Sequence, residues 1–207
     1  MEKQVADLHI LKEPKVKATL IALGVVVALY LLTGGWLNNI RTTSTTIHNN
    51  FVSLKDNCEH RVALIPQFIQ LLQYFAPGSH DLQQQLNIVY QAAKEPISES
   101  ILTDKAGMQA FIAHQREVTQ ILSYMVLQAN NTPSIAQNRQ YLMLRMQLMS
   151  FDQQIDYAVV LLNQNIITFN SLITGFPKEW LNALFVGEKP KQLVQVTTST
   201  SEAHEAK

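Results

Sequence analysis

The sequence predicts an all-α protein, with a single N-terminal transmembrane helix followed by an elongated antiparallel bundle of about four long helices. The first observation is an apolar, uncharged run over residues 18–37. The second is that apolar residues recur at helical spacing through most of the remaining chain. The third is the small number of turn-forming residues, seven glycines and seven prolines in 207 positions, which favours a few long helices over many strands.

The composition limits the size of the fold and the classes of partner. The chain has 207 residues, of which 47% are hydrophobic, enough for one domain with a substantial core. Its 16 basic and 16 acidic residues leave no net formal charge, so we expect no nucleic-acid partner. Cys58 is the single cysteine, which excludes a disulfide within the chain and a zinc cluster built from cysteines.

The uncharged run over 18–37 reads ATLIALGVVVALYLLTGGWL. As a helix it spans about 30 Å, the thickness of the hydrocarbon core of a bilayer. Tyr30 and Trp36 lie toward one end, where amphipathic rings favour the membrane interface. A cleavable signal peptide has a similar basic flank and apolar run. Because no small-x-small cleavage site follows, the sequence favours an uncleaved anchor in the lipid bilayer.

The distribution of basic residues predicts the orientation of this anchor. The lysines before it are Lys3, Lys12, Lys15 and Lys17. Arg41 is the only lysine or arginine within fifteen positions after it. The positive-inside rule therefore predicts a short cytoplasmic N-terminus, 1–17, and places the chain after the span on the extracytoplasmic side. No second apolar span follows, so we expect a single-pass protein.

The chain after the span has the pattern of long amphipathic helices with short connections. A polar juxtamembrane segment, 38–50, is either a continuation of the membrane helix or a linker. Apolar spacing then predicts a bundle domain over 51–189. Its helices are expected at about 51–75, 82–94, 103–128 and 134–174, with one or two further turns over 179–185.

Prolines and turn residues mark the expected ends of these helices. Pro66 removes an amide donor and should bend the first helix of the bundle. The sequence APGSHD at 76–81 is a break, with Ser79 or Asp81 able to cap the next helix. Pro177 should stop the last long helix. Residues 190–207 are polar and rich in serine and threonine, so we expect a disordered tail there.

No recognisable catalytic arrangement is present in the sequence. His60 and His114 lie on predicted helices, but neither has a partner in the H-E-x-x-H arrangement of a metal site. Cys58 and His60 lie two positions apart and point to different faces of a helix, so we expect a structural thiol. A phosphate-binding loop, a nucleophile elbow and paired carboxylates are also missing. We therefore expect no catalytic, cofactor-binding or metal-binding residue and no enzyme activity.

Three methionines recur in the last long helix. Met143, Met146 and Met149 are three positions apart in YLMLRMQLMSF. A methionine stripe can mark an adaptable binding groove, but it more often fills an irregular core. The sequence favours core packing here.

Two asparagines recur on the same predicted helix. In LLNQNIITFNSLITGFP, residues 161–177, Asn163, Asn170 and Pro177 lie seven positions apart, two helical turns. A second set with the same spacing consists of Leu162, Phe169 and Phe176. A buried asparagine is costly unless its amide is hydrogen-bonded, and on a helix seam it can fix register and partner choice. We favour a hydrogen-bonding role between helices over solvated side chains.

This region resembles the C-terminal signature of the LemA family, in which repeated Tyr-Asn pairs precede a Phe-Pro pair. The corresponding residues here are Asp152, Ile155, Ala158, Leu162-Asn163, Phe169-Asn170 and Phe176-Pro177. The family also has a Leu-Ile-Pro motif on its first soluble helix, which residues 61–81 resemble. The matching residues there are Arg61, Leu64, Ile65 and Pro66, followed by His80-Asp81. Departures from the family pattern occur at Ala63, Val159 and Leu162, in place of an acidic residue, an arginine and a tyrosine.

The resemblance implies a bundle of long helices on a single membrane anchor in bacteria. Together with the orientation predicted from the lysines, it leads us to expect the bacterial inner membrane, with the bundle on the extracytoplasmic, periplasmic side. It supplies no catalytic residue. The expected function is that of a non-enzymatic scaffold or protein-interaction module of the cell envelope. The expected partners are the bilayer and unidentified envelope proteins, with self-association left open. The alternative is an extracytoplasmic ligand-sensing bundle that acts through a partner protein.

Overall fold

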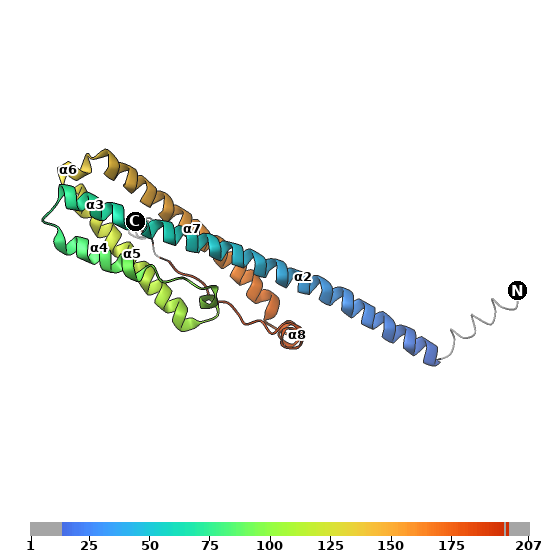
Figure 1. Cartoon of the computed structure of the whole chain (residues 1–207). Helices are drawn as coiled ribbons and strands as arrows, with labels where there is room; N and C mark the ends of the chain where they lie inside the picture. Colours follow the sequence, from blue (N-terminus) through green and yellow to red (C-terminus); the bar gives the residue numbers. More distant parts are fainter. Residues whose placement is uncertain (1–13, 197, 199–207) are drawn as a thin grey trace. The chain divides into compact units, whose positions relative to one another are not determined.

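The computed structural model describes residues 14–196 and residue 198, and the described chain is mostly α-helical (Figure 1). Within these residues no β-strand occurs, so the predicted all-α class is confirmed. The chain divides into two compact units, Met1–Thr42 and Thr43–Lys207. Most of the predicted cytoplasmic N-terminus, 1–17, lies outside the described residues.

Helix α2 (Pro14–Val62) is the longest element, with 49 residues. It begins at a proline, which is tolerated in the first turn because the amide there has no helical partner. The helix includes 18–37 and continues without a break through 38–50. The predicted juxtamembrane segment is therefore helix and not a linker.

Pro66 separates two helices where the sequence predicted one bent helix. α2 ends at Val62, and α3 (Ile65–Phe75) begins with Pro66 in its first turn. A proline within a helix would remove a hydrogen bond, so the chain places it where that amide is not needed. α4 (His80–Ala92) follows with Ser79 at the capping position. The Ser79 hydroxyl donates to the Ala76 carbonyl at 2.7 Å and does not cap the helix.

Aspartate and asparagine side chains cap the N-termini of the next two long helices. After the short 3-10 helix η1 (Glu99–Leu102), Asp104 caps α5 (Lys105–Asn130) by accepting from two amides. A single turn, α6 (Pro133–Ala136), precedes α7 (Arg139–Ile173), whose cap is Asn138. Asn138 Oδ1 accepts from the amides of Gln140 and Tyr141 at 2.8 and 3.2 Å. The predicted helix over 134–174 is therefore two helices.

The chain reverses after α7. Gly175 has a positive φ of 83°, which a glycine adopts without the steric cost of a Cβ atom. The Phe176–Pro177 peptide bond is cis, and α8 (Lys178–Phe185) follows. Gly187, with φ of 73°, then ends α8 and turns the chain back.

The second unit has one apolar core. Figure 1 shows α3, α4 and α5 packed side by side, with α7 running along them. Each helix contributes side chains from one face, as its 3.6-residue period predicts. Examples with almost no exposed surface are Ile65, Phe68, Leu86, Met125, Ile135 and Tyr141. The predicted helical bundle is confirmed.

The prediction of a disordered tail is wrong for the part of it that the structure describes. Residues 190–207 were expected to be disordered, but residues 188–196 and 198 run back along the bundle in an extended conformation (Figure 1). Val194 and Thr198 have no exposed surface. The polar composition did not predict this order, because main-chain N–H and C=O groups make most of the contacts of the segment, and composition does not report them. Residue 197 and residues 199–207 lie outside the described part.

No single helix among the described residues is long and apolar enough to cross a membrane. The bent pair α7 and α8 meets that criterion by length and composition, with a 90° bend between the two helices. α7 also supplies core residues of the bundle. The predicted span over 18–37 stays a prediction.

Candidate functional site

Side-chain amides on α7 and α8 hold the extended segment that follows them. Asn163 Nδ2 donates to the carbonyl of Val194, and the Val194 amide donates back to Asn163 Oδ1, both at 2.8 Å. Asn170 makes the same pair of bonds with Lys191, again both at 2.8 Å. Each asparagine therefore satisfies the N–H and the C=O of one residue at once, which fixes the position of the segment along α7.

Two further contacts extend this row. Asn182, on α8, donates to the Glu188 carbonyl at 2.8 Å and accepts from the Glu188 amide at 3.2 Å. Farther along α7, both Asp156 carboxylate oxygens accept from the Thr198 hydroxyl, at 2.8 and 2.9 Å. We call residues 188–196 and 198 the strap. We call its partners the ladder, which consists of Asn182, Asn170, Asn163 and Asp156.

The ladder fits the strap because their repeats have nearly equal lengths. Ladder residues on α7 recur every seven positions, about 10.5 Å along an α-helix. The first three strap partners recur every three positions, about 9.3 Å in an extended chain with three residues per turn. Over the longer interval from Asn170 to Asp156 the helix covers about 21 Å, and the strap from Lys191 to Thr198 covers about 22 Å. The fourth strap partner, Thr198, therefore lies four positions after the third, Val194. This longer step makes the distance along the strap nearly equal again to the distance along the helix.

The strap is also held by its side chains and by η1. The Gln192 amide donates to the Leu102 carbonyl at 2.7 Å, on η1. The Lys191 ammonium lies 5.0 Å from the centroid of the Phe169 ring, within the range of a cation–π contact. Val194 is fully buried. The side chains of Lys191, Val194 and Thr198 thus add specific contacts to an interaction that is otherwise made by the main chain.

Burial raises the pKa of the Asp156 carboxyl, and the hydrogen bond from Thr198 opposes this by a smaller amount. The folded chain therefore binds this proton more tightly than the unfolded chain does. The resulting stability is present below the ordinary pKa of 3.8 and is lost as the pH rises through the raised value.

Asp156→Asn should flatten this dependence, because asparagine keeps an acceptor for Thr198 and has no carboxyl to ionise. We expect the free energy of unfolding of the variant, relative to that of the wild type, to increase as the pH rises from the ordinary carboxyl range to neutrality. Urea denaturation at a series of pH values measures the difference. Equal pH profiles for the two proteins would contradict the assignment.

A second polar cluster lies inside the bundle and joins α2, α5 and α7. Arg61 has no exposed surface, and its Nη1 lies 3.2 Å from Asp152 Oδ1. The same nitrogen donates to Thr119 Oγ1 at 3.1 Å, and Nη2 donates to Gln115 Oε1 at 2.6 Å. A buried guanidinium is tolerated only with such compensation, so the cluster fixes how the three helices pack.

The remaining family-motif residues are structural. Leu64 and Ile65 are buried beside Arg61, where α2 ends and α3 begins, and Pro66 is half-buried there. Phe169 is fully buried on α7. Phe176 is 93% exposed, because α7 ends at Ile173 and the seven-residue repeat does not return Phe176 to the buried face.

Cys58 does not have the properties of a reactive thiol. Its side chain is buried, and burial raises the pKa of the thiol to about 11 from the ordinary 9.0, with Arg61 opposing the shift. His60 stacks on Phe151, with ring centroids 5.5 Å apart. No group of three or more potential metal-ligating side chains occurs among the residues that the structure describes.

Iodoacetamide at pH 8 should therefore alkylate Cys58 slowly in the folded chain and quickly in urea. The pKa shift alone lowers the thiolate fraction about a hundredfold. Burial slows the reaction further. Mass spectrometry of timed samples measures the rate. Equal rates with and without urea would contradict the burial of this thiol.

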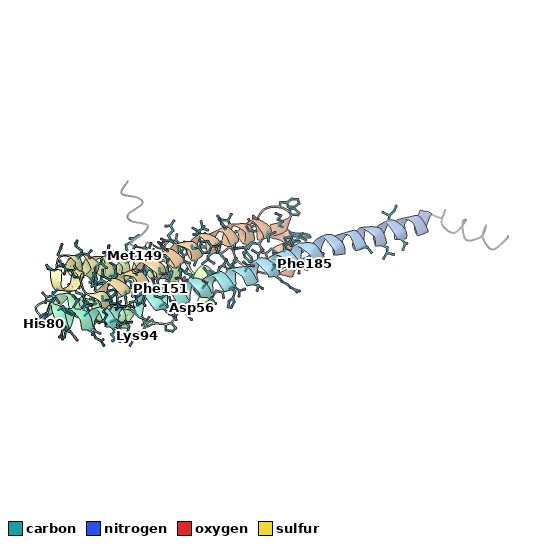
Figure 2. The ribbon with its side chains drawn as sticks, turned by 90° about the horizontal axis from the view of Figure 1, so that it is seen from above. Asp56, His80, Lys94, Met149, Phe151 and Phe185 are labelled. Carbon is teal, nitrogen blue, oxygen red and sulfur yellow. The ribbon has the colours of Figure 1, made fainter. Side chains whose placement is uncertain are left out.

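The methionine prediction is wrong. Met143, Met146 and Met149 are 55%, 71% and 49% exposed. α7 directs Tyr141, Leu144 and Leu148 into the core, and the three methionines lie on other faces of the helix. Figure 2 shows Met149 at the edge of the bundle.

The sequence pointed to only part of this site. It singled out Asn163 and Asn170 for hydrogen bonding, and both are half-buried, but their partner is an extended segment and not a helix. Asn182 and Asp156 were missed, as were Gln115 and Thr119. The apolar residues Leu193, Val194 and Val196 within a polar tail were the available signal that this segment packs.

The arrangement provides main-chain recognition and a buried ionic cluster. Among the described residues we identify no nucleophile paired with a base. Among curated proteins, no sequence match to the chain is found. The family model described as LemA family matches residues 50–207. This match covers the Arg61 cluster, the ladder and the strap, and the chain belongs to the LemA family.

Proposed function

We propose that this protein is a non-enzymatic, membrane-anchored interaction module of the bacterial cell envelope that acts as a scaffold. The observation that supports this most is the character of the site, which recognises polypeptide backbone. A site built from side-chain amides that pair with N–H and C=O groups suits a protein partner better than a reaction.

The proposed anchor is the part of α2 over 18–37. This stretch carries no charged residue and forms helix throughout. Its large apolar side chains for which exposure is described include Ile21, Leu23 and Val27, exposed by 68%, 59% and 50%. Apolar side chains in such a run are stable in lipid, which supports a single membrane span.

The proposed orientation follows from the lysines before the anchor, which favour a cytoplasmic N-terminus. A reporter enzyme that is active only outside the cytoplasm, fused after Lys207, should be active in cells. A fusion to a reporter that requires the cytoplasm should be inactive. The reverse pair of results would overturn the orientation and leave the bundle unaffected.

The outer face of α7 supports a role in protein binding. Several apolar side chains on the side of α7 that faces away from the core are exposed to solvent. The most exposed are Met143, Met146, Tyr157, Val160 and Ile167. Exposed apolar residues in a row on one helix are a common feature of protein interfaces.

Photo-crosslinking in native membranes tests the proposed function. A photoreactive amino acid at Met146 or Tyr157, on α7, should capture one or more envelope proteins. The same group at Gln84, an exposed polar position on α4, is the matched control and should capture none. An absence of partners at the α7 positions, or the same partners at Gln84, would overturn the proposal.

The alternative is a ligand-sensing bundle that acts through a partner. The observation that favours it is a solvent-open groove of about 370 Å³ between α4 and α5. Its polar lining includes Gln85, Glu117, Gln120 and Tyr124. This volume is in the range of small-molecule sites. A small molecule that raised the melting temperature of the wild type, but not of Glu117→Ala, would support sensing.

A further inference from the structure

We propose that the ladder is an exchangeable peptide-binding site, and that its second occupant is the strap of another copy of this chain. The proposal rests on the proposed function as an interaction module and identifies a site through which copies would associate. In the described state, each strap occupies the ladder of its own chain.

The contacts define what the site recognises. Asn163 and Asn170 bind the main chain of two residues that are three positions apart, and an extended chain with three residues per turn presents both to one side. The side chains add a lysine over an aromatic ring, a buried valine and a threonine bound to Asp156. The ligand is therefore an extended segment with the pattern Lys-x-x-Val-x-x-x-Thr.

A second copy offers this pattern in full. The segment KQLVQVTT, residues 191–198, occurs in every copy of the chain. Reciprocal exchange of two straps would preserve every ladder contact, so mainly the association of two molecules opposes it. Anchoring in one membrane would lower that cost, because it raises the local concentration of the copies.

The connection to the strap provides a place for the exchange to begin. Gly187 has a positive φ, and its amide donates to the main-chain carbonyl of Asn182 at the end of α8. Asn182 also holds Glu188 through a local contact, which would remain within each chain. The described residues beyond this point belong to none of the helices that form the core. The strap can therefore leave its ladder without unfolding a core helix.

Two complementary full-length variants test the proposal. The first, Lys191→Pro with Val194→Pro, removes the two strap amides that donate to the ladder residues of α7 and leaves the ladder intact. The second, Asn163→Asp with Asn170→Asp, removes the two amide donors of the ladder that lie on α7 and leaves the strap intact. Neither variant alone has both parts of the interaction, whereas a mixture of the two does.

Each variant is labelled with a donor or an acceptor dye at its N-terminus, and energy transfer is measured after the two are reconstituted together in lipid vesicles. We expect the mixture to associate at least about tenfold more tightly than either variant alone, given the number of hydrogen bonds restored. A variant with Asn165→Asp in place of the ladder changes is the control. Asn165 donates to the carbonyl of Leu161 on its own helix, so this variant should keep its own strap bound and not associate.

Circular dichroism first checks that each variant has the helix content and cooperative melting of the wild type. If the aspartate pair does not fold, Asn163→Gln with Asn170→Gln takes its place, since glutamine keeps an amide but displaces it. A mixture that associates no more than its components overturns the proposal. So does association of either variant alone, which would place the contact elsewhere. Photo-crosslinking of envelope proteins on α7 is independent of both outcomes, so failure here leaves the proposed function standing.

Discussion

Replacing Arg61 with methionine should lower the free energy of unfolding by about 3–5 kcal/mol, because the change removes the buried guanidinium that compensates the buried charge of Asp152. Gln115 Oε1 would also lose the donor that now lies 2.6 Å away. Thermal and urea denaturation of the purified full-length chain, followed by circular dichroism, measure the loss. A loss below about 1 kcal/mol, the range of an exposed ion pair, would contradict the role assigned to this cluster.

The double variant Arg61→Met with Asp152→Leu provides the control. Removing both charges avoids the desolvation penalty of either one alone, so the double variant should be more stable than Arg61→Met. The loss in the double variant should also be smaller than the sum of the two single losses. Additive losses would indicate that the two side chains act independently, although their N–O distance is 3.2 Å.

Replacing Asn163 and Asn170, the two ladder asparagines on α7, with aspartate should release the strap from α7 while the helices stay folded. The change removes two donors and places carboxylates against the carbonyls of Lys191 and Val194. At about 0.5–1.5 kcal/mol for each lost hydrogen bond, opening of the strap becomes easier by about 2 kcal/mol, which is more than a tenfold change. Trypsin reports this opening, because Lys191 is a cleavage site in the strap, whereas Lys189 precedes a proline and resists cleavage.

The expected result is rapid cleavage after Lys191 in the double variant and slow cleavage in the wild type. Sites within the helices should be cleaved at the same slow rate in both proteins. Asn165→Asp, which changes the same helix without touching the strap, should behave as the wild type. Equal cleavage at Lys191 in the wild type and the double variant would mean that the asparagines do not hold the strap.

Features governed by local physical chemistry were predictable from the sequence. Apolar residues at helical spacing placed most of the helices, since each helix buries one face. The ends were less predictable, because proline can either bend a helix or separate two. At Pro66 it separates α2 from α3. The methionines of α7 could not be assigned to the core or the surface until the faces of the neighbouring helices were known.

The site was only partly predictable for a different reason. The seven-residue spacing of Asn163 and Asn170 indicated one face of a helix, but it did not indicate what that face binds. The partner is main chain, and an N–H or C=O group carries no signature in a sequence. Lys191 and Val194 were therefore assigned to a tail by their polar surroundings. In contrast, Arg61 and Asp152 were singled out by family resemblance, and the structure brings them together.

The ladder holds the strap through the main chain of the strap. Amide hydrogen exchange of the full-length chain tests this interaction most directly. The amides of Lys191 and Val194 donate to Asn170 and Asn163 and should exchange far more slowly than those of an unstructured segment. In the variant Asn163→Asp with Asn170→Asp, both should exchange at nearly the unstructured rate, while helix amides stay protected. Exchange of both amides at the unstructured rate in the wild-type chain would contradict the claim.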